Sequence, residues 1–235
     1  MTHHRWFLLL ALVTAAFSAS AQAPVRSGAN LADNPVAQAR QNQSWEYGPF
    51  VNYGFGVGDR SDFKFLWGGV QAGKVLTPVL KAGIFSGQFE YSGNIMPLWQ
   101  AYTPAPHVED VVIKGVNYGN APFGGGTYRG VSLTPVILRW NFLSKSRHYQ
   151  PWFQGAGGLI YTTHKFPPSE MNPRAGTCVW NFSPQGGAGT HYFINPRHSL
   201  DLGVNAVHIS SASLGDKNPG VNASVQFQVG YTYWK

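Results

Sequence analysis

The sequence predicts an all-β fold, an eight-stranded antiparallel up-and-down transmembrane β-barrel, and three observations lead to it. Charged residues make up only 11% of the 235 residues and 28 are glycine, which suits a protein whose outside need not be charged. Apolar and polar side chains alternate along most of the chain from Ser44 onward, with the period of a β-strand. The connections between the predicted strands are alternately short and long, as at the periplasmic and extracellular ends of such barrels.

The N-terminal residues, 1–21, have the features of a secretory signal peptide. A basic residue, Arg5, precedes an apolar core over residues 6–17, and small residues stand before Gln22. A membrane-anchoring helix is the alternative, but the polar segment that follows favours cleavage. We expect residues 22–43 to form a periplasmic linker or short helix and residues 44–235 to form the barrel. The N-terminus offers the one apolar run long enough for a transmembrane helix.

The first three predicted strands cover residues 44–57, 63–76 and 85–99. The first places Tyr47, Val51, Tyr53, Phe55 and Val57 on one face. The second begins with Phe63, Phe65 and Trp67 in register and then loses the alternation. The third is the clearest in this half of the chain, because one apolar face is continuous. That face carries Phe85, Phe89, Tyr91, Ile95 and Trp99.

The remaining strands are predicted over residues 130–143, 152–163, 178–194, 199–210 and 224–234. The first two of these are apolar but ambiguous in phase. The third has an outward face with Trp180, Phe182, Ala188 and Tyr192. Short connections are expected at 77–82, 144–149 and 195–198, and long ones at 101–127 and 164–177.

The polar faces carry Ser, Asn, Gln and Gly with an occasional acid, Glu90 or Asp201, which indicates a hydrogen-bonded interior. A soluble lipocalin-type barrel would place charge outside and apolar side chains inside. A porin is a third possibility that the size disfavours, because so small a barrel is filled by its own side chains.

Composition limits the function further. The formal charge is +7, but Lys and Arg are scattered, which gives little support to nucleic-acid binding and is compatible with anionic lipid headgroups. Cys178 is the single cysteine, so no intrachain disulfide is available, and we interpret it as an ordinary strand or loop residue. The histidines, His191 among them, form no ligand-spaced cluster with acids or Cys178, so no metal or other cofactor is expected.

One strand carries an anomaly. Leu200, Leu202, Val204 and Ala206 share an apolar face, and two residues further on the same register continues with His208 and Ser210. With a periplasmic N-terminus the seventh strand runs outward, so this pair is expected near the outer rim, facing lipid. Such groups are costly there and functional by default. The pattern His-x-Ser has a second explanation, a histidine of the interfacial belt with a serine that begins the loop.

The segment from His208 to Ser210, Ala212, the loop 215–220 and the final aromatic strand resembles the C-terminal signature of the lipid A 3-O-deacylase family, the PagL-like outer-membrane acyloxyacyl hydrolases. Residues 87–91 and 184–187 are similar to further family segments. The resemblance covers most of the chain from Ser44 to Trp234. It implies an eight-stranded barrel that hydrolyses an ester-linked acyl chain of lipid A with a Ser–His–Glu triad on its outer wall.

Carried over, Ser210 is the nucleophile and His208 its general base. The family's acid falls on Asn222, which can accept a hydrogen bond from imidazole but supplies no charge. A β-bulge near Ala223–Ser224 is expected, because Asn222 is one residue out of phase with the apolar face of the last strand. Asp216 is an alternative acid.

Two further positions differ from the family pattern. The family's oxyanion Asn is Ser211 here, so the oxyanion hole is expected to use backbone N–H groups of the turn that includes Ser211 and Ala212. The chain ends on Lys235 rather than on an aromatic residue.

The sequence therefore predicts a membrane-embedded esterase of a Gram-negative-type outer membrane that acts on lipid A of the lipopolysaccharide leaflet, without nucleic acid, metal or cofactor. The alternative is a non-catalytic eight-stranded barrel with a structural or adhesive role. The acyl position that is cleaved, the acyl-chain length and the oligomeric state stay open.

Overall fold

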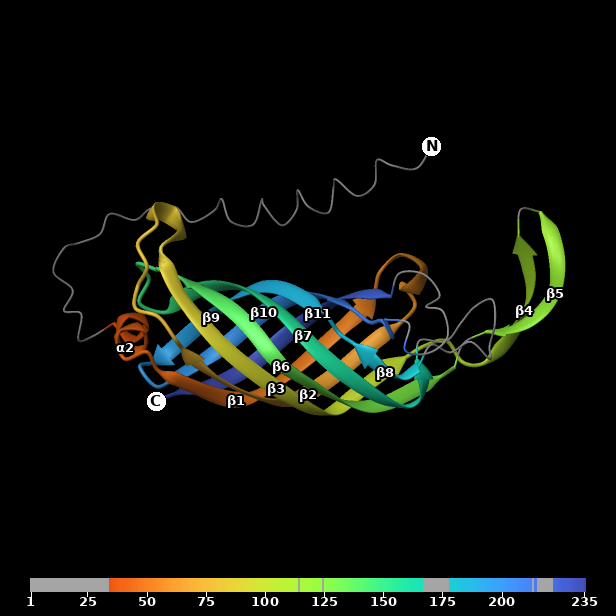
Figure 1. Ribbon diagram of the computed structural model, residues 1–235, viewed down its shortest axis with the longest axis horizontal. Helices are drawn as coiled ribbons and strands as arrows, with labels where there is room; N and C mark the ends of the chain where they lie inside the picture. The colour runs from red at the N-terminus through yellow and green to blue at the C-terminus, as the bar shows by residue number, and fades with distance from the viewer. Residues whose placement is uncertain (1–33, 114, 124, 167–177, 213, 215–221) are drawn as a thin grey trace. The chain divides into compact units, whose positions relative to one another are not determined.

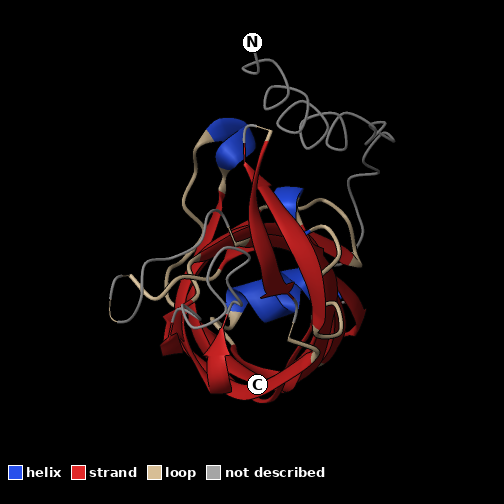
Figure 2. Ribbon diagram, turned by 90° about the vertical axis from the view of Figure 1, so that its right-hand side faces the viewer, coloured by secondary structure: helices blue, strands red, loops and turns tan. Residues whose placement is uncertain are grey.

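Eight antiparallel strands close into a barrel in the computed structural model (Figures 1 and 2). Around the ring they follow the order β6-β3-β2-β1-β11-β10-β9-β7, and β6 pairs with β7. The first strand, β1 (Trp45–Gly56), pairs with the last, β11 (Ala223–Trp234), from Glu46↔Trp234 to Gly56↔Ser224. This closure pairs the backbone all around the ring, as a membrane-spanning sheet requires. The predicted eight-stranded fold is confirmed.

The structure describes residues 34–113, 115–123, 125–166, 178–212, 214 and 222–235, and the predicted signal peptide lies outside them. The other strands of the ring are β2 (Lys64–Val75), β3 (Gly87–Tyr102), β6 (Thr127–Phe142), β7 (Tyr149–Phe166), β9 (Gln185–Asn195) and β10 (His198–His208). Two short 3-10 helices, η2 (Gly58–Arg60) and η3 (Gly83–Phe85), lie in the connections on either side of β2. None of the helices in the described ranges is long and apolar enough to cross a membrane.

The predicted strand over residues 178–194 is interrupted. It consists of β8 (Cys178–Phe182) and β9, which both pair with β7. The break falls at Ser183-Pro184, and Pro184 has no N–H to donate to a ladder. Cys178 begins β8 opposite Phe166, as an ordinary strand residue.

The long connection predicted over 101–127 contains strands of its own. β4 (His107–Ile113) and β5 (Val116–Phe123) pair as a separate two-stranded sheet. Where this connection leaves the barrel, its two ends are joined by a backbone hydrogen bond, which the Thr103 N–H donates to the carbonyl oxygen of Gly126 at 2.9 Å.

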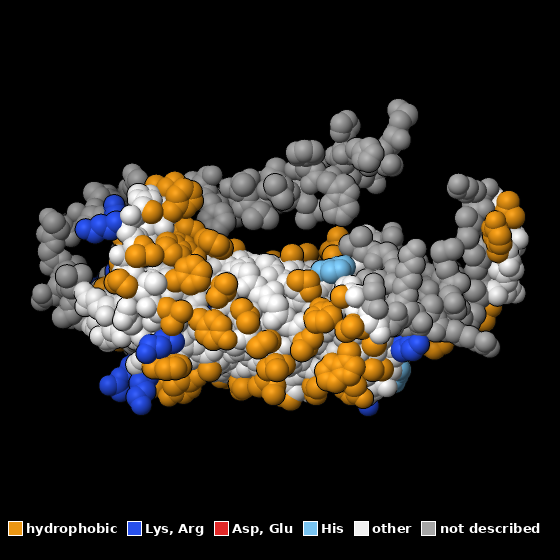
Figure 3. All heavy atoms as spheres, viewed as in Figure 1, with side chains coloured by type: hydrophobic (Ala, Val, Ile, Leu, Met, Phe, Trp, Pro, Cys, Tyr) orange, Lys and Arg blue, Asp and Glu red, His pale blue; other side chains and the backbone are white. Residues whose placement is uncertain are grey.

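The outer wall is apolar, as predicted. In β1 the side chains of Tyr47, Val51, Tyr53 and Phe55 are about half exposed and alternate with buried positions. Apolar side chains likewise dominate the barrel wall seen in Figure 3. A wall of this composition fits the hydrocarbon of a bilayer.

The lumen toward the end that α2 covers is polar and centred on Arg139. Its guanidinium lies 2.9 Å from Glu90 Oε1 and 3.2 Å from Glu46 Oε1, and donates to Gln154 Oε1 at 3.0 and 3.1 Å. The Arg139 guanidinium also lies 4.8 Å from the centre of the Trp152 ring. The hydrogen-bonded interior is confirmed for this part, and Arg139, in a strand of ambiguous phase, is a member that sequence reasoning missed.

A second part of the lumen is apolar, which the alternation did not predict. Trp67 and Trp99 stack with ring centroids 5.9 Å apart, and Phe166 lies 5.3 Å from Trp99. The expectation that Trp99 shares the outward face of Phe89 is wrong. The pairing of β3 with β6 shifts register between Met96 and Trp99, and this irregularity turns the indole inward.

A short helix, α2 (Pro35–Gln41), packs against one end of the barrel. Asn34 caps it through its side-chain oxygen, which accepts from the Ala37 N–H at 3.1 Å. Val36 and Ala39 are buried in a cluster whose other members are Val75, Phe193 and Trp234. The helix therefore covers the end of the barrel at which β1 begins and β11 ends (Figure 1).

Replacement of Arg139 by Met should destabilise the folded barrel by about 3–5 kcal/mol, because Glu46 and Glu90 stay buried and lose their shared partner. Arg129→Met is the matched control, since Arg129 lies on the same strand with an exposed side chain and should change stability by at most about 0.5 kcal/mol. Urea titration of the barrel in detergent micelles measures both. Equal midpoints for the two variants would contradict this account of the lumen.

Candidate functional site

Buried and half-buried side chains alternate at the end of β10 and through the two predicted site residues, His208 and Ser210. Val207 and Ile209 are each 1% exposed and belong to the apolar cluster of the lumen, and Ser211 is fully buried. His208 and Ser210 lie between them and are half-buried. By the alternation of a strand, both side chains face the outer wall, in the register of Leu202 and Val204.

Neighbouring strands hold this segment from both sides. The His208 N–H donates to the Pro184 carbonyl oxygen at 3.0 Å, across the break between β8 and β9. Ser210 and Phe182 exchange two backbone hydrogen bonds, of 2.7 and 3.0 Å. On the other side His208 pairs with Ala223 of β11. The break in the sixth strand thus supplies an acceptor for the segment that carries both candidate residues.

The spacing permits contact between the two side chains. Residues two apart on a strand are separated by about 6.6–6.8 Å along the backbone, within which an imidazole can reach a hydroxyl. The Ser210 Oγ accepts a hydrogen bond from the Ala212 N–H at 3.2 Å. Ala212 has a φ of 47°, so the chain turns sharply directly after the serine. An amide that points at Oγ lies beside the position where charge would develop on a substrate carbonyl.

The Ser211 side chain faces the lumen, so only the backbone of this residue can take part in a site on the outer wall. Its Oγ is buried and has no hydrogen-bond partner among the described residues. Its carbonyl oxygen accepts from the Leu214 N–H at 2.9 Å and stabilises the turn. The sequence predicts that backbone N–H groups of this turn form the oxyanion hole. The inward orientation of the Ser211 side chain is compatible with that prediction.

Asn222 lies on the other side of the barrel wall from His208. It is 6% exposed, its Oδ1 accepts from Arg60 Nε at 3.1 Å, and its carbonyl oxygen accepts from the Ile209 N–H at 2.9 Å. The predicted β-bulge near Ala223–Ser224 is wrong, because the pairing of β10 with β11 is regular to its last pair, His208↔Ala223. Asn222 therefore shares the inward phase of Ser224, and the outward position opposite His208 belongs to Ala223. Asp216, the alternative acid, lies outside the described residues.

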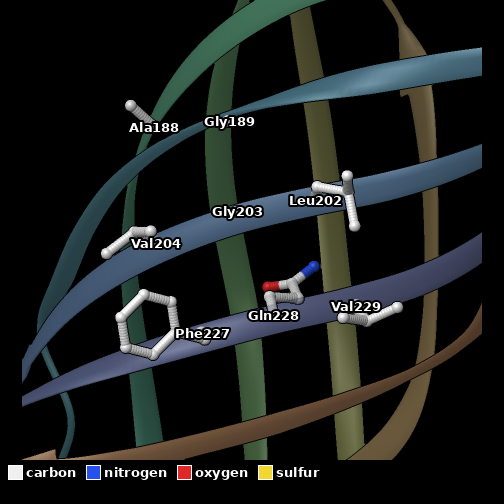
Figure 4. Close-up of a pocket in the computed structure, with 8 residues that line it drawn as sticks. All are labelled: Ala188, Gly189, Leu202, Gly203, Val204, Phe227, Gln228 and Val229. Atoms are coloured by element: carbon white, nitrogen blue, oxygen red, sulfur yellow. The ribbon is translucent and has the colours of Figure 1, made fainter. Parts of the chain in front are cut away.

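The outer wall is hollowed below the pair, over β9, β10 and β11. Figure 4 shows this groove, of about 320 Å³, with Leu202, Val204, Phe227 and Val229 on its surface. Val204 and His208 are four residues apart on one strand, about 13 Å. The groove and the pair therefore lie on one continuous apolar surface.

A cluster inside the lumen corrects the expectation that no histidine forms a ligand-spaced cluster with acids. His191 Nδ1 is 2.6 Å from Asp201 Oδ1, and ligand atoms of Glu46, His191 and Asp201 lie within 4.8 Å of one another. Their positions in three strands, far apart in sequence, hid this proximity. The carboxylates already accept protein hydrogen bonds, Asp201 from Ser199 and Thr232 and Glu46 from Gln71. These contacts fit a buried hydrogen-bond network better than a metal centre.

The family model described as lipid A 3-O-deacylase (PagL) matches residues 87–232. Among solved structures, the outer-membrane enzyme PagL is 13% identical, with 78% of this chain and 97% of that chain covered and a TM-score of 0.45. Neisserial surface protein A is 12% identical, with coverage of 80% and 96% and a TM-score of 0.45. The outer-membrane protein OprG from Pseudomonas aeruginosa is 11% identical, with coverage of 82% and 96% and a TM-score of 0.41. No curated protein matches the sequence.

The orientation of this segment can be tested by thiol labelling of the folded barrel in detergent, in a Cys178→Ser background. Cysteine introduced by His208→Cys or Ser210→Cys should react with a maleimide, because those positions face outward. Val207→Cys and Ile209→Cys are the matched inward controls and should react only after unfolding. Labelling of the inward pair at the rate of the outward pair would contradict the assigned register.

Proposed function

The chain belongs to the lipid A 3-O-deacylase (PagL) family, and from this we propose that it is an esterase that hydrolyses an ester-linked acyl chain of lipid A. It is an outer-membrane protein of Gram-negative bacteria, so lipid A is the lipid of the leaflet at its extracellular end. One observation carries the proposal: His208, the last residue of β10, and Ser210, two residues further on, are half-buried and have the outward phase of Leu202 and Val204, at the end of the barrel away from α2. Lipid-facing ionisable groups are costly and call for a functional explanation.

The reaction we propose proceeds in two steps. The Ser210 Oγ attacks the ester carbonyl carbon while His208 takes the hydroxyl proton, and a tetrahedral intermediate forms. The bond from this carbon to the sugar oxygen then breaks, His208 protonates the leaving alcohol, and an acyl-serine remains. Water, deprotonated by His208, attacks the acyl-serine and releases the fatty acid with Ser210 restored.

Backbone amides of the turn would stabilise the oxyanion. The Ala212 N–H already points at Ser210 Oγ, and the Ser211 N–H belongs to the same turn. Donors fixed by the fold need no reorganisation when charge develops, which is why such holes lower barriers. The groove at Leu202 and Val204 would hold the acyl chain against the wall, and the proposed chemistry uses no metal or cofactor.

Asn222 acts in this proposal by positioning. Its carbonyl oxygen accepts from the Ile209 N–H, between His208 and Ser210, and its side chain is bonded to Arg60 in the lumen. The inward orientation of the Asn222 side chain favours the second candidate function, a non-catalytic barrel with a structural or adhesive role. A barrel that had lost catalysis could carry an amide, facing the lumen, at the position of the family's acid.

Mass spectrometry of lipid A from cells that express the full chain separates the two functions. The enzyme should remove one ester-linked acyl chain, and His208→Ala or Ser210→Ala should lower that conversion by at least about 100-fold, because each removes proton transfer or the nucleophile. His198→Ala, at the opposite end of the same strand, is the matched control and should retain activity. Unchanged lipid A with the folded wild-type chain would reject the esterase and leave the non-catalytic barrel.

A carboxylate placed opposite His208 should increase the rate. In Ala223→Glu the new side chain would start from the position paired with His208, where cross-strand Cβ atoms lie about 4.5–5.5 Å apart. It could then orient the imidazole and stabilise the imidazolium, so kcat should rise about tenfold or more. Asn222→Glu is the control, since its carboxylate would face Arg60 in the lumen and leave kcat unimproved. A rise in kcat for Asn222→Glu alone would show that residue 222 reaches the outer face during turnover.

A further inference from the structure

The connection between β2 and β3 exposes a set of large apolar side chains at the end of the barrel that α2 covers. Over residues 76–86 it contains a single charged residue. Four of its apolar side chains have exposed fractions between 44% and 87%. We name these four the apolar tip: Leu76, Leu80, Ile84 and Phe85. A contiguous exposed set of this kind marks an interaction with a membrane or with another protein.

Hydrogen bonds within the connection fix the shape of this exposed segment. The buried Ser86 side chain accepts from the Ala82 N–H at 2.9 Å and donates to the Gly83 carbonyl oxygen at 2.7 Å. The Phe85 N–H donates to the Ala82 carbonyl oxygen at 3.1 Å. Gly83 has a φ of 59°, which a residue without a Cβ adopts at little cost. The fold therefore holds the apolar tip outward in one defined conformation.

The apolar tip continues the lipid-facing wall of the barrel. Leu76 follows β2 in the outward phase of Ala72, and its N–H donates to the Phe89 carbonyl oxygen at 2.7 Å. The Phe85 carbonyl oxygen accepts from Trp140 Nε1 at 3.2 Å. The rings of Phe89 and Trp140 lie 5.9 Å apart on the outer face of β3 and β6. The tip is thus joined at both of its ends to side chains and backbone of the wall.

The connection stands beside the barrel. In Figure 1 it rises above the wall at the end where α2 lies, and Figure 2 shows η3 outside the ring of strands. Hydrophobic side chains lie on this protrusion in Figure 3. Trp140 is close to the end of β6, where aromatic residues mark the membrane–water interface. The apolar tip therefore lies at the level of the lipid headgroups, on the side of the wall that faces lipid.

From the exposure, the fixed shape and the lateral position of the apolar tip, we propose that it inserts into the periplasmic leaflet of the surrounding bilayer. The short connections assign this end of the barrel to the periplasmic side. An interfacial element buries its apolar face about 5–10 Å into the boundary between headgroups and acyl chains. A second copy of the chain would also cover the tip, but continuity with the lipid-facing wall favours lipid. This inference does not depend on the esterase activity, because the tip and the His208–Ser210 pair lie at opposite ends of the barrel.

Fluorescence quenching of the full chain in phosphatidylcholine vesicles tests the proposal. In a Cys178→Ser background, Ile84→Cys carries an environment-sensitive fluorophore, and the control carries it at Lys145→Cys, an exposed position in the connection between β6 and β7 at the same end. Lipids spin-labelled near the headgroup end of the acyl chain should quench the label at position 84 at least about twofold more strongly, because only this label enters the boundary region. Aqueous iodide should quench the two labels in the opposite order.

Both labelled positions are exposed, so both variants should fold, which the heat-dependent mobility of the barrel on denaturing gels checks. Equal quenching of the two labels by the spin-labelled lipids would overturn the proposal. So would protection of the label at position 84 that appears only at a high ratio of protein to lipid, since this would identify a second copy as the occupant.

A second variant asks whether the apolar side chains themselves drive insertion. With the fluorophore at Leu80→Cys, the changes Ile84→Ser and Phe85→Ser together should lower quenching by the spin-labelled lipids by about twofold or more, because the interfacial contact scales with the buried apolar area. Unchanged quenching in this variant would show that the connection lies at the bilayer for another reason and would also reject the proposal.

Discussion

The structure depends on one constraint, the pairing of each of the eight ring strands with two neighbours around a closed ring. Within hydrocarbon an unpaired backbone N–H or carbonyl has no water to bind, so the sheet must close. The long β1–β11 pairing closes it, and each strand then has one face toward lipid and one toward the lumen. On β10 this division places Leu202, Val204 and His208 outside, while Asp201 and Val207 lie inside, and Ser210, two residues beyond the strand, keeps the outward phase.

The two faces satisfy different demands. The outer face can be apolar throughout, but the lumen must pair every polar group that it buries. The Arg139 guanidinium is paired with Glu46, Glu90 and Gln154, whereas nearer the candidate site the lumen is filled by stacked indoles and Phe166. The segment that carries the candidate pair therefore packs on this aromatic cluster through Val207 and Ile209, which suits a pair of residues that must hold one orientation.

The alternation of apolar and polar residues predicts correctly which side chains face outward wherever a strand is regular. It fails where the pairing shifts register or a strand is interrupted. The outward face of β1 and the register of His208 and Ser210 follow directly from it. Trp99 was misplaced because a register shift carries no reliable signal in a single sequence, and the break at Pro184 was visible only as one proline within a strand-like run. The contacts of Arg139 and His191 join strands distant along the chain, so no local pattern could indicate them.

Asn222 shows the limit of assigning a family's catalytic roles to a sequence from residue spacing alone. Sequence spacing puts the family's acid at Asn222 and demands a bulge to bring it to the outer face. The observed register has no such bulge, and Arg60 provides a reason for Asn222 to face inward, since its Nε finds an acceptor there. No carboxylate of the described residues lies opposite His208, so in the proposed mechanism residue 222 supplies no charge to the imidazolium formed during attack, and this would raise the barrier. In the proposed mechanism the height of the barrier therefore depends on the His208↔Ala223 pair, where the neighbouring strand presents a methyl group to the proposed base.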